Sequence, residues 1–293
     1  MATAMVLSGF GDVQVRETFI TASIGRPRIR FKHGSHVAFS KLAKGRRSQS
    51  EAEFAFQSEG ATSCVVVLHE VWGLVDHIED VCKRVGKFGF AAVAPNLYKG
   101  NEDLLTPGNI QGAMEGLWDL SLEERRDKAK VAWALERKKA TEEAKQVAGL
   151  IYDPSFRDRM LDGVVAAVEE AHSNFSKVAT MGFCLGGGLS LKCATKTKHL
   201  ATAISFYGQP PPPGEVGKIS VPILDIHAFQ DELINKGVPE FVRGMLDGGK
   251  DLMLKTFPQT KHGFFNDTRK DVYNNEAAIQ AWDLTRWFLE RTI

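Results

Sequence analysis

Long hydrophobic runs are absent from this sequence of 293 residues, and none approaches the roughly 18 apolar residues that a transmembrane helix needs. An excess of one charge is absent too: 37 Lys and Arg stand against 36 Asp and Glu, for a formal net charge of +1. A balanced charge gives no electrostatic footprint for nucleic acid or for a membrane surface. We therefore expect neither kind of partner.

Cysteine is scarce, and its spacing excludes two further classes. The four cysteines are Cys64, Cys82, Cys184 and Cys193. They show no CxxC spacing and are too sparse for a disulfide scaffold, which predicts reduced thiols in an intracellular, cytoplasmic protein. No cluster has metal-ligand spacing, and no phosphate-binding glycine loop occurs in a suitable context. We expect no metal and no organic cofactor.

Residues 1–50 differ in composition from the rest and are interpreted as an N-terminal extension. They are rich in Arg and Lys, and their only acids are Asp12 and Glu17. This composition resembles an organelle transit peptide, which would place the protein in a compartment such as a plastid. Alternatively, residues 28–31 and 36–39 alternate polar and apolar side chains around Gly34, as a β-hairpin would. We favour the hairpin slightly.

Residues 51–293 are predicted to form one α/β domain. Short apolar runs alternate with helical patterns, which indicates a mostly parallel sheet with helices on both faces. The predicted strands cover 65–68, 90–94, 178–181, 203–206, 223–226 and 252–255. The predicted helices cover 76–86, a segment beginning near 185, and about 277–289, and a helical insertion spans about 106–173.

The middle of the insertion is very highly charged, over residues 123–128. Its simplest interpretation is a solvated helix face with weak ion pairs between neighbouring turns. The alternative is a lid over the active site, with Met114, Leu117 and Trp118 facing the pocket.

The strongest chemical signal is the segment Gly182-Phe183-Cys184-Leu185-Gly186-Gly187. It follows a predicted strand and opens a predicted helix, which is the arrangement of a nucleophile elbow with cysteine in the place of serine. Glycines at the flanking positions let strand and helix approach closely. The start of the following helix favours a thiolate and offers N–H groups to an oxyanion.

A nucleophile of this kind needs a base and an acid that orients the base. In sites built on a nucleophile elbow, the acid follows the nucleophile in the chain and the histidine comes last. His262 lies in the loop after strand 252–257, and Asp231 lies just past strand 222–226. Asp225 is a rival acid, but its place inside the strand favours structural contacts. Two other histidines are interpreted as a surface residue and a buried structural residue: His199 and His227. The loop after the first buried strand, 69–73, is expected to supply a second oxyanion donor, and Glu70 there is costly to bury unless it is paired.

Together these motifs resemble the dienelactone hydrolase family, from about residue 63 to the C-terminus. The matching segments are His69-Glu70-Val71-Trp72-Gly73-Leu74, Asn96-Leu97-Tyr98, the elbow, and His262-Gly263-Phe264-Phe265-Asn266-Asp267. The resemblance implies an α/β-hydrolase fold.

The resemblance also implies roles for individual residues. Cys184 would be the nucleophile, His262 the base and Asp231 its orienter. Glu70 would contact the resting thiol and help to generate the thiolate. The remaining implied positions are the oxyanion donors Val71 and Leu185 and a substrate pocket of Trp72, Tyr98, Trp118 and Phe264.

The chain departs from the family at the positions that bind the substrate carboxylate. Asn266 stands where an arginine follows the catalytic histidine, and no second arginine is found over 111–118. Dienelactone itself is therefore doubtful as the substrate, and Arg269 is a possible substitute.

The predicted function is hydrolysis of small carboxylic esters or lactones through a thioester acyl-enzyme, by a protein expected to be a monomer. Three alternatives remain open. The same triad could serve a thioesterase or another acyl hydrolase, since a fold does not dictate its substrate. The chain could be a binding protein that kept the fold, or Cys184 could have a thiol redox role with Cys193.

Overall fold

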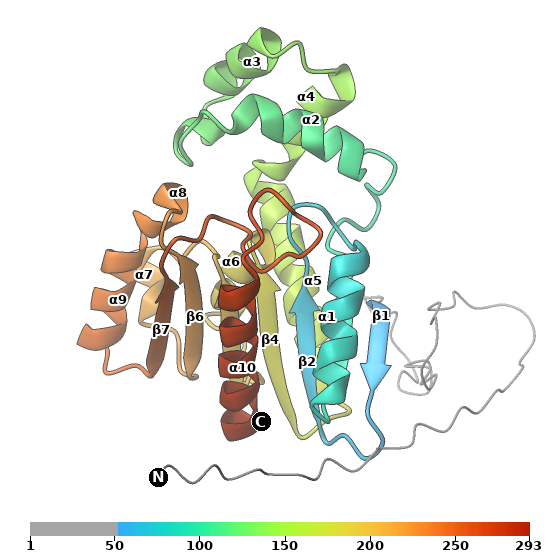
Figure 1. The fold of residues 1–293 in the computed structure, drawn as a ribbon, viewed down its shortest axis with the longest axis vertical. Helices are drawn as coiled ribbons and strands as arrows, with labels where there is room; N and C mark the ends of the chain where they lie inside the picture. The colour runs from blue at the N-terminus through green and yellow to red at the C-terminus, as the bar shows by residue number, and fades with distance from the viewer. Residues whose placement is uncertain (1–51) are drawn as a thin grey trace, which may run out of the picture.

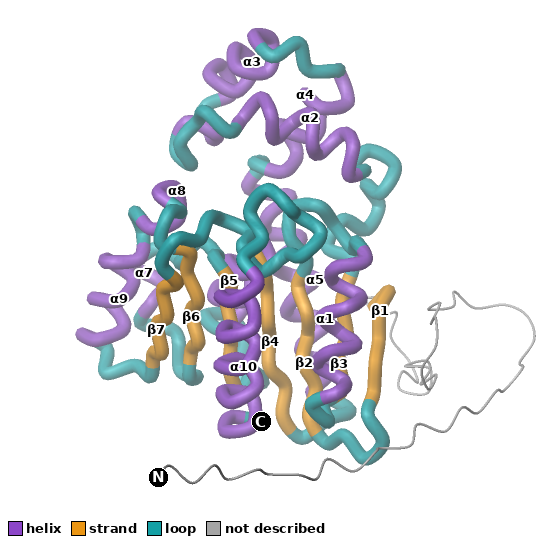
Figure 2. Tube along the Cα trace, viewed as in Figure 1, coloured by secondary structure: helices purple, strands orange, loops and turns teal. Residues whose placement is uncertain are grey.

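The computed structural model describes residues 52–293, so the hairpin or targeting segment predicted over 1–50 lies outside the described residues. A seven-stranded sheet with strand order β1-β3-β2-β4-β5-β6-β7 forms the centre of the molecule (Figures 1 and 2). The strands are β1 (Ala52–Gln57), β2 (Ser63–Leu68), β3 (Ala91–Pro95), β4 (Lys177–Phe183), β5 (Thr202–Phe206), β6 (Ile223–Ala228) and β7 (Leu252–Phe257). β1 is antiparallel to β3, and the other neighbours are parallel.

Helices cover both faces of this sheet, as the alternation of patterns predicts. The helices are α1 (Asp76–Lys87), α2 (Pro107–Leu117), α3 (Lys128–Arg137), α4 (Glu142–Ile151), α5 (Pro154–His172), α6 (Leu185–Cys193), α7 (Pro213–Val216), α8 (Glu232–Asn235), α9 (Val238–Asp247) and α10 (Asn275–Thr292), with a 3-10 helix η2 (Glu124–Arg126). α1 and α10 pack on one face, and α5, α6 and α9 on the other (Figure 1). No helix within residues 52–293 is long and apolar enough to cross a membrane.

The central strands are buried on both sides, which is why they appear as continuous apolar runs in the sequence. In β2, Val65 and Val67 pack with α1 and α10, whereas Val66 and Leu68 pack with the helices of the opposite face. All six residues of β2 are buried. The predicted strands agree with the structure to within two residues at each end, except that β1 has no counterpart among them.

The segment between β3 and β4 is not one continuous helix but several short ones. α2, α4 and α5 each begin at a side chain that accepts a hydrogen bond from the helix's first turn: Thr106, Thr141 and Asp153. Such caps start new helices because they satisfy otherwise unpaired N–H groups. η2 and α2 to α4 lie beyond the carboxyl ends of the strands, whereas α5 packs on the sheet itself (Figure 1).

Candidate active site

Cys184 sits on a sharp turn between β4 and α6. Its φ and ψ are 52° and −112°, a region that side-chain-bearing residues rarely adopt. The turn is held by the Cys184 N–H, which donates to the Phe206 carbonyl at 2.9 Å. A Cβ atom on Gly182 would lie 2.0 Å from the Gly186 oxygen, so the glycine spacing of the motif has a steric cause. Backbone strain of this kind is common at functional residues.

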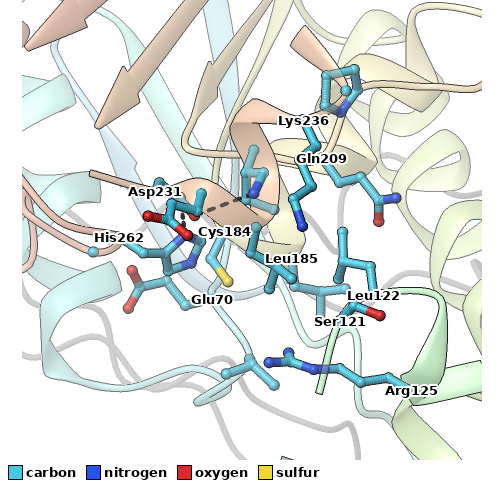
Figure 3. Close-up of a pocket in the computed structure, with 18 of the residues that line it drawn as sticks. Glu70, Ser121, Leu122, Arg125, Cys184, Leu185, Gln209, Asp231, Lys236 and His262 are labelled. Carbon is cyan, nitrogen blue, oxygen red and sulfur yellow. Dashed lines mark hydrogen bonds and ion pairs between the residues drawn. The ribbon is translucent and has the colours of Figure 1, made fainter. Parts of the chain in front are cut away.

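His262 and Asp231 meet beside Cys184, although they come from two different loops (Figure 3). His262 Nδ1 lies 2.5 Å from Asp231 Oδ2. The other carboxylate oxygen, Asp231 Oδ1, accepts the Ile234 N–H at 3.3 Å and so caps α8. Asp231 is 4% exposed, which fixes its orientation towards the histidine. All three residues line one cavity.

The environment of His262 favours its protonated form. Desolvation in the site would lower the pKa of His262, but four interactions oppose it. The electrostatic interaction with Cys184, the hydrogen bonds with Asp231 and Cys184, and the charge of Asp231 together raise the pKa well above its usual value. A protonated histidine next to a cysteine favours the thiolate, which is the nucleophilic form of the side chain.

Glu70 lies at the start of the loop that follows β2 and is 3% exposed. Its Oε1 accepts the Tyr207 hydroxyl at 3.1 Å, and its Oε2 accepts the Asn266 amide at 2.6 Å. The Asn266 amide is itself oriented, because its Oδ1 accepts both the N–H and the hydroxyl of Thr268. Two donors thus hold a carboxylate, and these partners are Tyr207 and Asn266 rather than the thiol implied by the resemblance.

The two predicted oxyanion donors belong to two different segments of the cavity wall. Val71 and Leu185 both line the cavity that contains Cys184. Leu185 is the first residue of α6, so its N–H lies ahead of the helical hydrogen-bond ladder. The loop of Val71 is anchored because its carbonyl accepts the Tyr98 hydroxyl at 2.7 Å. Gly186 donates its N–H to the His69 carbonyl at 3.1 Å and joins the two donor segments.

The cavity above the triad has a volume of about 1150 Å³. Of the four residues expected to form a substrate pocket, Trp72 and Trp118 line this cavity, whereas Tyr98 and Phe264 do not and are 3% and 0% exposed. Tyr98 packs against His69 instead, with ring centroids 4.7 Å apart, and Phe264 packs on the ring of Tyr207. Both predicted residues therefore support the walls of the site from behind.

The insertion lines part of the cavity, but with a different set of residues from the one that the lid hypothesis predicts. Met114 and Trp118 line the cavity, whereas Leu117 is fully buried in the core. Arg125, from the charged stretch interpreted as a solvated face, is 7% exposed and lines the cavity. The charge density alone could not distinguish an arginine that faces solvent from one that faces inward.

The weaker histidine candidates lie elsewhere. His199 is exposed and pairs with Glu169 at 2.5 Å, and His227 is buried with its Nε2 2.7 Å from Asp225 Oδ2. Cys193 is fully buried, and burial raises the pKa of its thiol to about 12. Among the described residues no group of three or more His, Cys, Asp or Glu side chains is placed to hold a metal ion.

The mostly parallel sheet, the cysteine on a strand–helix turn and the acid and histidine in later loops define an α/β hydrolase. Within that class, the dienelactone hydrolase family profile matches residues 52–293, and the chain belongs to this family. The family membership confirms the resemblance identified in the sequence, and with it the prediction of a hydrolase.

Known relatives agree with this assignment. A Saccharolobus solfataricus protein named "Putative carboxymethylenebutenolidase" is 38% identical over 245 residues, which cover 81% of this chain and 93% of that protein. "Protein usf" of Aquifex pyrophilus is 30% identical and covers 77% of this chain and 87% of its own length. Among solved structures, a dienelactone hydrolase-like promiscuous phosphotriesterase from metagenomic libraries has a TM-score of 0.59 at 20% identity, covering 80% of this chain and 87% of its own. A dienelactone hydrolase from Anabaena variabilis has a TM-score of 0.54 at 14% identity, covering 84% and 98%.

Proposed function

We propose that this protein hydrolyses carboxylic esters or lactones through a Cys184–His262–Asp231 triad and a thioester acyl-enzyme. The observation that carries the proposal is the placement of Cys184 on a strained turn next to His262, whose own Nδ1 lies 2.5 Å from Asp231. A nucleophile, a base and an orienting acid in this relation are the minimal machinery of acyl transfer.

The first half of the reaction forms the thioester. The Cys184 thiolate attacks the carbonyl carbon, and the electron pair of the C=O bond moves to the oxygen. In this proposal the N–H groups of Val71 and Leu185 stabilise the oxyanion. When the oxyanion collapses, the C–O bond to the leaving alcohol breaks, and protonated His262 gives its proton to the alcohol oxygen.

The second half releases the acid and restores the resting state. Neutral His262 takes a proton from water, whose oxygen attacks the thioester carbonyl. Collapse of the second tetrahedral intermediate breaks the C–S bond and returns the Cys184 thiolate beside protonated His262. Asp231 keeps Nδ1 as the donor to its carboxylate throughout, so that Nε2 exchanges the proton.

Glu70 is proposed to modulate the nucleophile through its charge. It lines the same cavity as Cys184, and its carboxyl group accepts hydrogen bonds from Tyr207 and Asn266. A carboxylate at this place favours a positive charge on His262 and so supports the proton that the leaving group requires.

The proposal is tested by hydrolysis of p-nitrophenyl acetate and of a panel of simple lactones by the wild type and Cys184→Ala. We expect turnover in the wild type, a loss of at least about 1,000-fold in the variant, and an acyl adduct on the intact wild-type protein that hydroxylamine removes. Cys193→Ala is the matched control, because this cysteine lies on α6 but is buried away from the cavity. Full activity of Cys184→Ala would refute the assignment of the nucleophile, and dependence on Cys193 would favour the redox alternative.

A further inference from the structure

Two arginines enclose one tyrosine in the wall of the cavity, and the proposed reaction uses neither. Arg125 comes from η2, and Arg157 comes from α5. Their guanidinium carbons lie 6.0 Å and 5.1 Å from the centre of the Tyr152 ring. Arg125 reaches from the insertion into the cavity that holds Cys184 (Figure 3).

Backbone and hydroxyl groups use only part of the donor capacity of these arginines. Arg125 donates its Nε–H to the Leu120 carbonyl and an Nη1–H to the Tyr152 hydroxyl, both at 3.0 Å. Arg157 donates its Nε–H to the Ile151 carbonyl at 3.0 Å. These bonds fix each guanidinium at its Nε edge and leave further N–H groups of each fork without a protein acceptor within the described part of the chain, in two residues that both line the cavity.

Within residues 54–293, neither arginine forms an ion pair with a carboxylate, whereas several other arginines and lysines do. Three carboxylates of the cavity lining are exposed and therefore solvated: Glu123, Glu232 and Glu240. Arg125, by contrast, is only 7% exposed. Arg126 adds a like charge, since it lowers the pKa of Arg157 together with burial, the larger cause. Enclosed charges without a counter-ion are costly, and an anion between them would relieve that cost.

The family's usual arginine position is not available for this purpose. Asn266 stands there and is already engaged, because it donates to Glu70 and accepts from Thr268. Arg269, the possible substitute, also lines the cavity, but two of its N–H groups already donate to Asp271. The arginines without a carboxylate partner are the better candidates for an anionic group of a substrate. Both arginines line the cavity that also contains Cys184, and Arg157 is close enough for Cys184 to influence its pKa.

We infer that Arg125 and Arg157 form a binding site for an acidic group, a carboxylate or a phosphate, at the end of an extended ester or lactone substrate remote from its scissile carbonyl. Planar guanidinium forks match both groups through paired charge-assisted hydrogen bonds. A cavity of about 1150 Å³ holds a substrate long enough to reach from the thiol to the insertion, since pockets of roughly 300–1,000 Å³ hold drug-sized ligands. This inference rests on the proposed ester hydrolysis and adds the substrate class.

The test compares two substrates that differ only in the distal charge: p-nitrophenyl hydrogen suberate and its neutral methyl ester, p-nitrophenyl methyl suberate. We expect the wild type to show a kcat/KM for the acidic ester at least about tenfold higher, the scale of one charge-assisted hydrogen bond. Equal values, or a preference for the neutral ester, would overturn the inference without any variant.

Variants then locate the site. Arg125→Gln and Arg157→Gln should each lower the ratio of acidic to neutral kcat/KM by about 10- to 100-fold, mainly through KM. The ratio is insensitive to partial unfolding, which lowers both activities equally. Two exposed arginines of the same region are matched controls, and their replacement should leave the ratio unchanged: Arg137→Gln on α3 and Arg159→Gln on α5. An unchanged ratio in both Arg125→Gln and Arg157→Gln would contradict the assignment.

Calorimetric titration separates this inference from the proposed chemistry. Free suberate should bind wild-type protein and bind at least about tenfold more weakly to the Arg125→Gln and Arg157→Gln variants. Hexyl phosphate in the same titration shows whether a phosphate is preferred to a carboxylate. Arginine-dependent binding without any ester turnover would refute the proposed ester hydrolysis but support the anion site. Ester turnover without arginine-dependent binding or selectivity would support the hydrolysis but refute the anion site.

Discussion

The close approach of α6 to the loop after β2 predicts a large effect of one methyl group. A Cβ atom on Gly186 would lie 2.3 Å from the Leu68 oxygen and 2.7 Å from the His69 oxygen. Because unbonded carbon atoms pack at about 3.5–4.0 Å, Gly186→Ala must push the start of α6 away by about 1 Å. That shift costs about 1–3 kcal/mol in overpacking and about 1 kcal/mol for the Gly186–His69 hydrogen bond. We expect a total loss of about 2–4 kcal/mol.

The same shift should also damage catalysis. The start of α6 carries Cys184 and the Leu185 N–H, so a displacement of about 1 Å misplaces the nucleophile and an oxyanion donor together and should lower kcat/KM about 100-fold. Urea unfolding followed by circular dichroism measures the first effect, and hydrolysis of p-nitrophenyl acetate by the folded variant measures the second.

A second glycine provides the control for this experiment. A Cβ atom on Gly163, within α5, would meet nothing within 4 Å. Gly163→Ala should therefore stabilise the protein by about 0.5–1 kcal/mol and leave activity unchanged, because glycine is unfavourable inside a helix. If Gly186→Ala keeps wild-type stability and activity, then α6 does not depend on this close approach, and the steric explanation of the motif is wrong.

Three further predictions concern charge. Asp231→Asn removes the hydrogen-bonded carboxylate that raises the pKa of His262. The basic limb of the pH profile of kcat/KM for an alkyl ester should therefore move to lower pH. If the limb does not move, Asp231 does not set this pKa. Burial lowers the pKa of His69 to about 4, so the unfolded chain binds a proton there below about pH 6.5 while the folded one does not. The free energy of unfolding should therefore fall by up to about 3 kcal/mol as the pH drops from about 6.5 to about 4. In His69→Gln the urea unfolding midpoint should depend less on pH over that range. The same pH dependence in the wild type and the variant would show that His69 is not responsible. Asn266→Leu leaves buried Glu70 short of one donor and should cost about 1–3 kcal/mol by urea unfolding, and no loss would mean that this hydrogen bond is unimportant.

Much of the framework is local in origin and was predictable for that reason. The strands buried on both faces form unbroken apolar runs, so β2 to β7 were identified without knowledge of their neighbours. The elbow around Cys184 depends on short-range steric contacts, so the spacing of its glycines was enough to predict it. Asp231 and His262 each follow a strand of one parallel sheet, and such strands deliver their ends to the same edge.

The finer architecture of the site depends on contacts between distant segments. Glu70 meets Tyr207 and Asn266 across 137 and 196 positions, so its partners could not be inferred from spacing. The places of Tyr98 and Phe264 behind the cavity wall follow from ring packing, which no periodicity reports.

The charged stretch of the insertion is the clearest case. Arg125 and Arg126 are adjacent in an evenly charged segment, yet the first is buried and the second is exposed. The short helix η2 turns one of them towards Tyr152, which lies 27 positions away and accepts its hydrogen bond. The local sequence thus determines where a strand ends and where the nucleophile lies. Which side chains face one another across the cavity is decided by packing, because a side chain is oriented by neighbours that only the folded chain brings near.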